Sequence, residues 1–466
     1  MNTGKAILRK ILSTEYYFLR YQNKYILYTM GGKTSLMNES AVQLIQWIRE
    51  NRNIDGIPVS LLGQIEMALS SANRKSSSRF IKNRELSLPS MVTVSLTNAC
   101  TLRCKYCYAS AGDRSVIFLD LNIFSLALDI IFSNAKMLDQ KVCKVHYLGN
   151  GESTYNWPLF IKSVKMARAK SDEYGLPLLM HVTTNGIFGD NERSYLAKHI
   201  DSITLSIDGL SKHQNALRPL PNGKPSWKIV ITTARYFFKN HQKWGFRITV
   251  TDKNVHDISD IIKFLSSSFP GIPIRFEPMH YCGRSLDTDV QGPEHNVFIE
   301  EYLKGKTFAE QYGNPVSYSG VRALAQFEND SFCGIATPNF CLKEDGSIVA
   351  CFSGMDNAYT YGYYNTHSNK FVVDEQKIKK LRTLSVKYSE KCQSCFARLH
   401  CLGDCPSIRI TSSRSDISEQ YKRGIGRCSL NKSIVLAHIL MALQIPINTQ
   451  DILKGGEISC AETYGG

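Results

Sequence analysis

Three cysteines, Cys100, Cys104 and Cys107, are spaced so that together they could hold a metal cluster. They follow the apolar run 91–96, so their C-x3-C-x2-C loop leaves a predicted strand. Three thiolates at this spacing can each bind one iron of a [4Fe–4S] cube and leave the fourth iron without a protein ligand. An open iron can bind a second molecule. The alternatives are a zinc site or three unrelated buried thiols.

The triplet resembles the cysteine motif of the radical S-adenosylmethionine (SAM) superfamily, and Tyr106 fits the aromatic position before the third cysteine. The resemblance implies that the open iron binds the amino and carboxylate groups of SAM and passes it an electron. SAM is then cleaved to methionine and a 5′-deoxyadenosyl radical, which takes a hydrogen atom from the substrate. The cofactor carries the difficult step, and the protein orients it and excludes water.

A glycine-rich turn follows the second predicted strand, with the residues Gly149, Asn150, Gly151 and Glu152. It resembles the Gly-Gly-Glu motif of the same family, in a Gly-Asn-Gly-Glu form. Glycines let a ligand approach the backbone closely. The resemblance implies that Glu152 accepts charge-assisted hydrogen bonds from the SAM ammonium group. The alternative is an ordinary strand-end turn with an exposed glutamate.

Two later strand ends carry polar turns, one with Asn185 and one with Ser206-Ile-Asp-Gly. His213 and Arg218-Pro follow, and the run resembles the Ser-x-Asp-Gly, His, Arg order of the peptide-modifying branch of the superfamily. The resemblance implies that Ser206 and Arg218 hold the SAM carboxylate, the arginine through a forked contact. Each turn alone is common turn chemistry. Their order after the cysteine triplet makes Asn185, Ser206 and Arg218 candidate cofactor contacts.

A second block of cysteines lies between residues 333 and 428. Its C-x2-C-x5-C-x3-C core resembles the SPASM domain, which extends many radical SAM enzymes, most of them acting on peptides and proteins. A pair of zinc ribbons is the alternative. The cysteines of this block are Cys333, Cys341, Cys351, Cys392, Cys395, Cys401, Cys405 and Cys428.

The SPASM resemblance implies two auxiliary [4Fe–4S] clusters. One would use Cys392, Cys395, Cys401 and Cys428, and the other Cys333, Cys351 and Cys405. Cys341 is where the resemblance weakens. It is either the fourth ligand beside Cys333, Cys351 and Cys405, or a buried thiol that leaves their cluster open to substrate. Cys143, Cys282 and Cys460 fit no pattern, and Cys143 is expected in the core.

Alternating strand and helix patterns from residue 91 to about 277 must position these groups. Six β/α units favour an α/β fold whose parallel sheet curls into a partial (β/α)6, TIM-like barrel, with functional residues at the carboxyl ends of its strands. Thr249, Thr251 and Glu277 should line the same rim. The predicted strands are 91–97, 142–148, 178–184, 202–207, 246–251 and 272–277, and the predicted helices 120–136, 157–173, 191–199, 224–241 and 256–267.

The residue pattern of the N-terminal part of the chain predicts a strand-helix subdomain. Residues 15–30 read as two strands around a polar turn, followed by a helix capped by Asn38 or Ser40, a second helix at 61–72 and a polar linker at 73–79. The pattern is similar to the leader-recognition element of peptide-modifying enzymes, in which an edge strand pairs with a leader peptide. A packing subdomain without a recognition role is the alternative.

The chain of 466 residues is long enough for several domains. We expect an N-terminal subdomain at 1–80, a radical SAM partial barrel at 88–280, a linker or bridging region at 281–332, a cysteine-rich auxiliary-cluster domain at 333–430, and a C-terminal helix and tail at 431–466.

Composition limits where the protein is located and what it binds. No window reaches the roughly 18 apolar residues of a membrane span, and the first residues do not resemble a signal peptide, so a cytoplasmic location is expected. Fourteen cysteines in such a chain favour metal binding over disulfides. The formal net charge of +15 favours an acidic partner, but lysine and arginine are spread along the chain, so nucleic acid is unlikely to be that partner.

The leading interpretation is a radical SAM/SPASM maturase that installs an oxidative cross-link (thioether, ether or C–C) in a ribosomally made precursor peptide with a leader. A flavodoxin or ferredoxin would reduce it. One alternative is an anaerobic sulfatase-type maturase, which forms formylglycine, but Phe352 stands where that family carries an Asp. Another is a non-catalytic iron–sulfur protein, against which Glu152 and Arg218 argue. The sequence assigns no catalytic residue.

Overall fold

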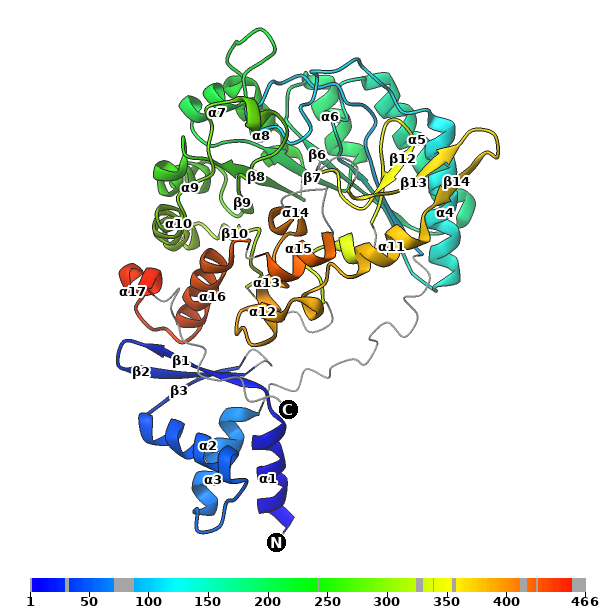
Figure 1. Cartoon of the computed structure of the whole chain (residues 1–466). Helices are drawn as coiled ribbons and strands as arrows, with labels where there is room; N and C mark the ends of the chain where they lie inside the picture. Colours follow the sequence, from blue (N-terminus) through cyan, green and yellow to red (C-terminus); the bar gives the residue numbers. More distant parts are fainter. Residues whose placement is uncertain are drawn as a thin grey trace.

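The computed structural model describes residues 2–29, 33–70, 88–241, 243–323, 330–337, 339–353, 358–410, 417–424 and 426–454. The predicted linker at 73–79 and Cys460 lie outside these ranges. A small N-terminal module sits at one end of a large α/β body, and the cysteine-rich helices lie between them (Figure 1).

One 11-stranded sheet organises the body, in the order β10-β9-β8-β7-β6-β5-β4-β11-β12-β13-β14. Neighbours are parallel from β10 to β11 and antiparallel from β11 to β14, and the sheet does not close. The expected α/β fold with a partial parallel barrel is confirmed. The six predicted strands are β4 (Met91–Val94), β5 (Cys143–Tyr147), β6 (Leu178–Thr184), β7 (Ser202–Ser206), β8 (Trp244–Val250) and β9 (Ile274–Pro278).

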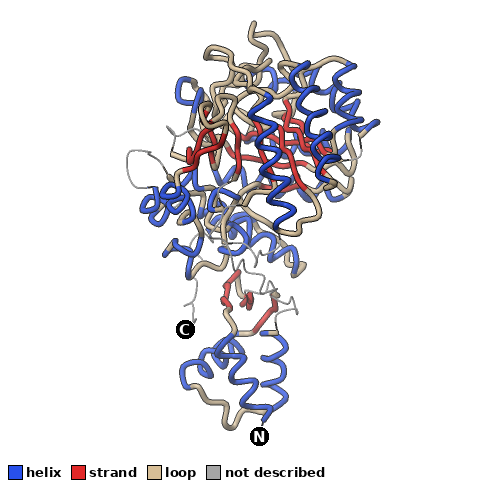
Figure 2. Tube along the Cα trace, turned by 90° about the vertical axis from the view of Figure 1, so that its right-hand side faces the viewer, coloured by secondary structure: helices blue, strands red, loops and turns tan. Residues whose placement is uncertain are grey.

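Helices cover the outer face of this sheet (Figure 2). The predicted helices all form, and α7, which is short and has no clear apolar stripe, was not predicted. In β8, Trp244, Phe246 and Ile248 are buried, whereas Gly245 and Arg247 on the other face are only partly buried. The helices are α4 (Leu121–Met137), α5 (Trp157–Tyr174), α6 (Asp190–His199), α7 (Ser211–Leu217), α8 (Trp227–Asn240), α9 (Ile258–Ser268) and α10 (His295–Glu310).

The sheet continues on both sides of the predicted barrel. Within the expected bridging region 281–332, α10 leads into β10 (Val316–Tyr318), which pairs in parallel with β9. On the other side, β11 (Phe340–Leu342) pairs in parallel with β4 and places Cys341 opposite Thr93. The cysteine-rich region therefore shares its sheet with the barrel. Its remaining strands are β12 (Ser347–Val349), β13 (Thr360–Asn365) and β14 (Lys370–Val373).

The N-terminal module is a three-stranded antiparallel sheet covered by helices. The predicted hairpin forms as β1 (Tyr16–Tyr21) and β2 (Lys24–Thr29), and the Asn38 side chain caps α2 by accepting from the Ala41 N–H. β3 and the first helix were not predicted. The other elements are α1 (Asn2–Ser13), β3 (Thr34–Met37), α2 (Glu39–Asn51) and α3 (Val59–Leu69).

Alternate residues of β1 point to opposite sides of this small sheet, as the strand period requires. Tyr16 and Phe18 pack against the module's own helices, whereas Tyr17 and Leu19 belong to the core of the large body. The small sheet is therefore an apolar layer between two cores, which docks the module on the body.

Short helices make up most of the cysteine-rich region, and a longer one closes it. Within the described parts of the chain, no helix is both long and apolar enough to cross a membrane. The helices are α11 (Glu375–Arg382), α12 (Glu390–Gln393), α13 (Arg398–Cys401), α14 (Pro406–Arg409), α15 (Ile417–Arg423), α16 (Cys428–Ala442) and α17 (Thr449–Lys454).

Candidate active site

The cysteine loop after β4 is held in shape by hydrogen bonds to its backbone. The guanidinium of Arg103 donates to the carbonyls of Cys100 and Gly112, both at 3.0 Å. Arg284 donates to the carbonyl of Cys104 at 2.7 Å. These contacts use backbone oxygens, so they leave the three thiols free to bind iron.

The thiols of Cys100, Cys104 and Cys107 interact electrostatically with one another. Burial raises the pKa of Cys104 to about 12 and that of Cys100 to about 11, so the free thiols stay protonated at neutral pH. A bound metal would supply the charge that deprotonates them.

Among the described residues, no three metal-binding side chains converge closely enough to hold a single ion. A [4Fe–4S] cube spreads its thiolates over different irons, so ligands to a cube need not meet at one point.

A cavity of about 200 Å³ opens beside these thiols. It is called the SAM-site cavity below, because the candidate SAM contacts line it. The structure brings every cofactor-binding candidate of the sequence to its wall, because the carboxyl ends of parallel strands meet at one rim. Those residues are Tyr106, Gly149, Asn150, Gly151, Glu152, Asn185, Ser206 and Arg218.

Glu152 is buried but well supplied with hydrogen-bond donors. The hydroxyls of Thr154 and Thr184 donate to one carboxylate oxygen at 2.8 and 2.9 Å, and the Asn185 N–H donates to the other at 2.8 Å. Burial raises the pKa of Glu152, while these donors act in the opposite direction. The carboxylate can accept further hydrogen bonds, so it suits an ammonium group in the cavity.

Tyr106, Asp208 and Arg218 form a buried trio, of which Tyr106 and Arg218 line the cavity. The Tyr106 hydroxyl donates to Asp208 at 2.6 Å and accepts from Nη1 of Arg218 at 2.8 Å. Burial raises the pKa of Asp208 to about 6. Among the described residues, no group accepts from the buried Nε of Arg218. This unmet donor fits the carboxylate of SAM, the role expected of Arg218.

The glycine-rich turn packs against the cysteine loop too closely for side chains. A Cβ on Gly151 would lie 2.3 Å from the Ala99 carbonyl oxygen, and one on Gly149 would lie 2.1 Å from Ser95 Cβ. Asn150 between them donates its side-chain amide to the carboxylate of Glu344 at 3.1 Å. Asn150 thus ties the turn to the cysteine-rich region, a role that its neighbours in sequence do not reveal.

The auxiliary cysteines fall into two groups. Cys405 interacts electrostatically with Cys333 and Cys351, and so does Cys341. The thiol of Cys401 interacts with Cys392 and Cys395, and that of Cys428 with Cys392. Cys333, Cys351 and Cys405, with Cys341 beside them, are called the first auxiliary group below. Cys392, Cys395, Cys401 and Cys428 are called the second auxiliary group.

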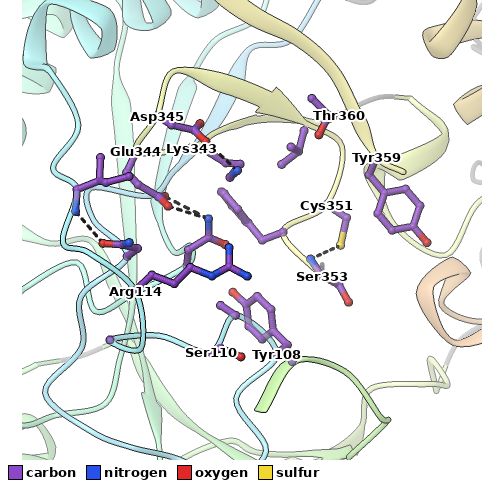
Figure 3. A pocket seen from close by; sticks show the side chains of 18 of the residues that line it. Tyr108, Ser110, Arg114, Lys343, Glu344, Asp345, Cys351, Ser353, Tyr359 and Thr360 are labelled. Atoms are coloured by element: carbon purple, nitrogen blue, oxygen red, sulfur yellow. Dashed lines mark hydrogen bonds and ion pairs between the residues drawn. The ribbon is translucent and has the colours of Figure 1, made fainter. Parts of the chain in front are cut away.

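A second cavity, of about 550 Å³, is lined by Tyr108 and Ser110, which follow the cysteine loop, and by Cys351 of the first auxiliary group (Figure 3). Cys351 and Phe352 line it, and Tyr108 and Asn150 line both this cavity and the SAM-site cavity. The Tyr108 hydroxyl donates to the Gly149 carbonyl at 2.6 Å. The two cavities are thus neighbours with a shared wall.

The structure adds site residues that the sequence did not single out. Cys282 lines the SAM-site cavity, lies 3.4 Å from Nε2 of His280, and interacts electrostatically with both Cys107 and Cys351. His280 and Arg247 line the same cavity. No local motif marks these residues, because they reach the site through the sheet and the loop after β9.

Comparison with known proteins agrees with this geometry. Residues 94–265 match the radical SAM superfamily. The chain contains a radical SAM domain. It is 29% identical over 263 residues to the uncharacterized protein MJ0907 of Methanocaldococcus jannaschii, covering 55% of this chain and 82% of that protein. It is 26% identical over 178 residues to the sporulation killing factor maturation protein SkfB of Bacillus subtilis, covering 38% of this chain and 39% of SkfB.

Two solved structures share the fold of this chain. The native anSMEcpe structure with bound AdoMet superposes with a TM-score of 0.58 at 16% identity, covering 78% of this chain and 99% of that one. Streptococcus suis SuiB bound to the precursor peptide SuiA superposes with a TM-score of 0.50 at 15% identity, covering 87% of this chain and 98% of that one. Likeness at these identities shows a common fold.

Proposed function

We propose that this radical SAM enzyme is a maturase that installs an oxidative cross-link in a ribosomally synthesised precursor peptide. The observation that carries the proposal is the shared wall between the SAM-site cavity and the cavity lined by Cys351. A substrate there would lie between the radical source and an electron acceptor. SkfB is a maturation protein, and SuiB and anSMEcpe have been crystallised with peptides, which supports a peptide substrate.

When bound, the first cluster and SAM would supply the radical chemistry that removes one hydrogen atom from the peptide. Closing a thioether, ether or C–C bond releases a second hydrogen as a proton and an electron. The auxiliary clusters are the proposed acceptor of that electron, and a flavodoxin or ferredoxin the proposed reductant for SAM cleavage. The peptide therefore loses two hydrogens for each bond formed.

The residues of the cavity would bind and orient these groups. Cys100, Cys104 and Cys107 would hold the first cluster, and the carboxylate of Glu152 would accept from the SAM ammonium. Ser206 and the unmet Nε donor of Arg218 would hold the SAM carboxylate. Holding the target C–H bond close to the radical would select the modified residue.

The two auxiliary cysteine groups would hold two further clusters, with Cys341 as the fourth ligand of the first. Its thiol is buried and interacts electrostatically with Cys351 and Cys333. Buried Arg409 donates to Cys392 Sγ at 3.7 Å, so it would offset part of the negative charge of the second cluster.

The N-terminal module is the proposed site for the leader of the peptide. β3 is an edge strand of the small sheet and pairs only with β2 among the described residues. An edge strand offers unpaired backbone groups to which an extended peptide can add. We infer that the enzyme meets its precursor peptide in the cytoplasm.

An anaerobic sulfatase-type maturase is the second candidate, because anSMEcpe shares the fold. Phe352 stands directly after Cys351, and it lines the cavity there. Phenylalanine cannot accept a proton, so formylglycine formation would need another residue as the base.

The deciding experiment is anaerobic turnover. The protein is reconstituted to about twelve iron atoms per chain, as three four-iron clusters require, and incubated with SAM, dithionite and a candidate precursor peptide encoded beside its gene. We expect the peptide to lose two hydrogens and 5′-deoxyadenosine to form, and neither to occur with Cys100→Ala. The peptide without its leader should react more slowly. No 5′-deoxyadenosine from fully loaded protein would refute the radical mechanism.

A further inference from the structure

A third cavity, of about 730 Å³, lies on the inner face of the sheet. Leu148, Thr183, Arg247 and Glu277 line both this cavity and the SAM-site cavity, so the two cavities share a wall. Its far end lies near the starts of β7 and β8, at Ser202 and Lys243. The cavity therefore extends from the amino-terminal side of the sheet to the wall of the SAM-site cavity.

Positive charge dominates the wall of this cavity. Lys243, Arg247, Arg275 and Arg322 line it, against the single carboxylate of Glu277. Arg247 forms an ion pair with Glu277 at 3.3 Å. Across the part of the chain that the structure describes, no carboxylate lies within ion-pair distance of Lys243, Arg275 or Arg322.

Strand register places two of these cations side by side, and Arg275 is exposed, so solvent screens part of their repulsion. Arg247 on β8 lies directly opposite Arg275 on β9, and Ser317 on β10 lies on the other side of Arg275. Like charges opposite each other on neighbouring strands destabilise a sheet. Glu277 offsets the charge of Arg247, but nothing described offsets that of Arg275. Unfavourable charge that is kept in a cavity indicates a ligand of opposite charge.

Two histidines, His146 and His181, also line this cavity. His146 and His181 lie edge to face with ring centroids 4.5 Å apart. Burial lowers the pKa of His146 to about 3, and the charges of His181 and Arg247 add to this effect. Burial likewise lowers the pKa of His181, to about 4. Both rings are neutral at pH 7, so they add polar hydrogen-bonding groups without adding charge.

The cations could instead serve the auxiliary clusters, which are themselves anionic. Arg322 fits that role, because it interacts electrostatically with Cys333 and Cys401 and donates to the Phe332 carbonyl at 2.8 Å. Among the described residues, no hydrogen bond joins the side chain of Lys243 or Arg275 to a cysteine. These two side chains are therefore the ones left to bind an external anion.

We propose that this cavity binds a carboxylate of the peptide substrate through Lys243 and Arg275, so that an acidic position of the peptide sets which residue reaches the SAM site. The inference rests on the peptide-maturase proposal and adds a specificity-determining subsite to it. The carboxylate could belong to an acidic side chain or to the peptide C-terminus, and a peptide has room in a cavity of about 730 Å³ for either.

The test is calorimetric binding to the full, cluster-loaded chain, without SAM or reductant. The probes are acetyl-tetraglutamate amide, acetyl-tetraglutamine amide and acetyl-tetraglutamine with a free C-terminus. We expect tetraglutamate to bind at least about tenfold more tightly than tetraglutamine amide, as one charge-assisted hydrogen bond would give. Tighter binding of only the third probe would assign the subsite to a C-terminal carboxylate.

The double variant Lys243→Gln/Arg275→Gln should abolish this preference. Its matched control is Lys228→Gln/Arg235→Gln, which removes the same charge from exposed positions of α8. Iron content and melting temperature show that both variants fold. Equal affinity for all probes, or equal loss in both double variants, would overturn the subsite. Because no turnover is involved, either result leaves the maturase proposal to its own experiment.

Discussion

At the residue scale, Glu152 shows how a buried carboxylate stays available to a ligand. It is 4% exposed, and burial alone would favour its neutral form. Two hydroxyls and one backbone N–H stabilise the charged form instead. The same donors fix its orientation toward the SAM-site cavity.

The Glu152→Gln variant is expected to bind SAM about 10- to 100-fold more weakly, because a neutral amide loses charge-assisted hydrogen bonds worth roughly 1.5–3 kcal/mol. Equilibrium binding of SAM to the reconstituted, unreduced protein measures the effect. Glu173→Gln, at a side chain that is 61% exposed, is the matched control. Unchanged affinity at full iron content would show that Glu152 does not contact SAM.

At the element scale, α16 is the helix that closes the cysteine-rich region. Most of its side chains are buried, and His438 is a partly buried histidine on the same helix. Burial lowers the pKa of His438 to about 4, and Lys306 and His400 act in the same direction. Its Nδ1 has no hydrogen-bond partner among the described residues. The helix therefore carries a group that resists protonation in the folded state.

This histidine should make the fold sensitive to mild acid. The unfolded chain binds a proton near pH 6.5, whereas the folded chain does so near pH 4. Between these values the unfolded state holds more protons, so stability falls as the pH is lowered below 6.5. At pH 5.5 the loss is about 1 kcal/mol.

The His438→Leu variant should lose about 1 kcal/mol less stability than the parent protein between pH 7.5 and pH 5.5. Anaerobic urea unfolding of the cluster-loaded protein at the two pH values measures the difference. His256→Leu, at an exposed position, is the control. If both variants keep the pH dependence of the parent, the acid sensitivity arises elsewhere.

At the scale of the whole molecule, the N-terminal module is joined to the cysteine-rich region by polar contacts as well as by apolar packing. The Tyr28 hydroxyl donates to Nε2 of His400 at 2.7 Å, and Nδ1 of that ring donates to the Arg322 carbonyl at 2.8 Å. Arg398 pairs with Glu15 at 2.8 Å. His400 thus links the small sheet, α13 and the segment after β10.

The Tyr28→Phe variant should lower the free energy of unfolding by about 1–3 kcal/mol, because it leaves the buried Nε2 of His400 without a donor. Hydrogen exchange should show faster opening of β1 and β2, with SAM cleavage unchanged. Tyr25→Phe, on the same strand but without a described hydrogen bond from its hydroxyl, is the control. Equal effects of the two variants would mean that the link to His400 does not hold the module.

The sequence by itself determined the chemistry and the main architecture. The spacing of Cys100, Cys104 and Cys107 predicts a cluster because ligand geometry is local, and the six strands follow from short apolar runs between helical patterns. Parallel pairing then brings Glu152, Ser206 and Arg218 to one rim. Adjacent residues and simple periodicities carry all of this information.

Only the tertiary structure decided how the distant parts meet. β11 has three residues, too few for a period to predict that it joins β4 and sets Cys341 opposite Thr93. The contact of Asn150 with Glu344 and the pairing of Arg247 with Arg275 depend on register between strands and loops far apart in the chain. Burial and charge at these positions arise from the folded environment, which no local pattern encodes.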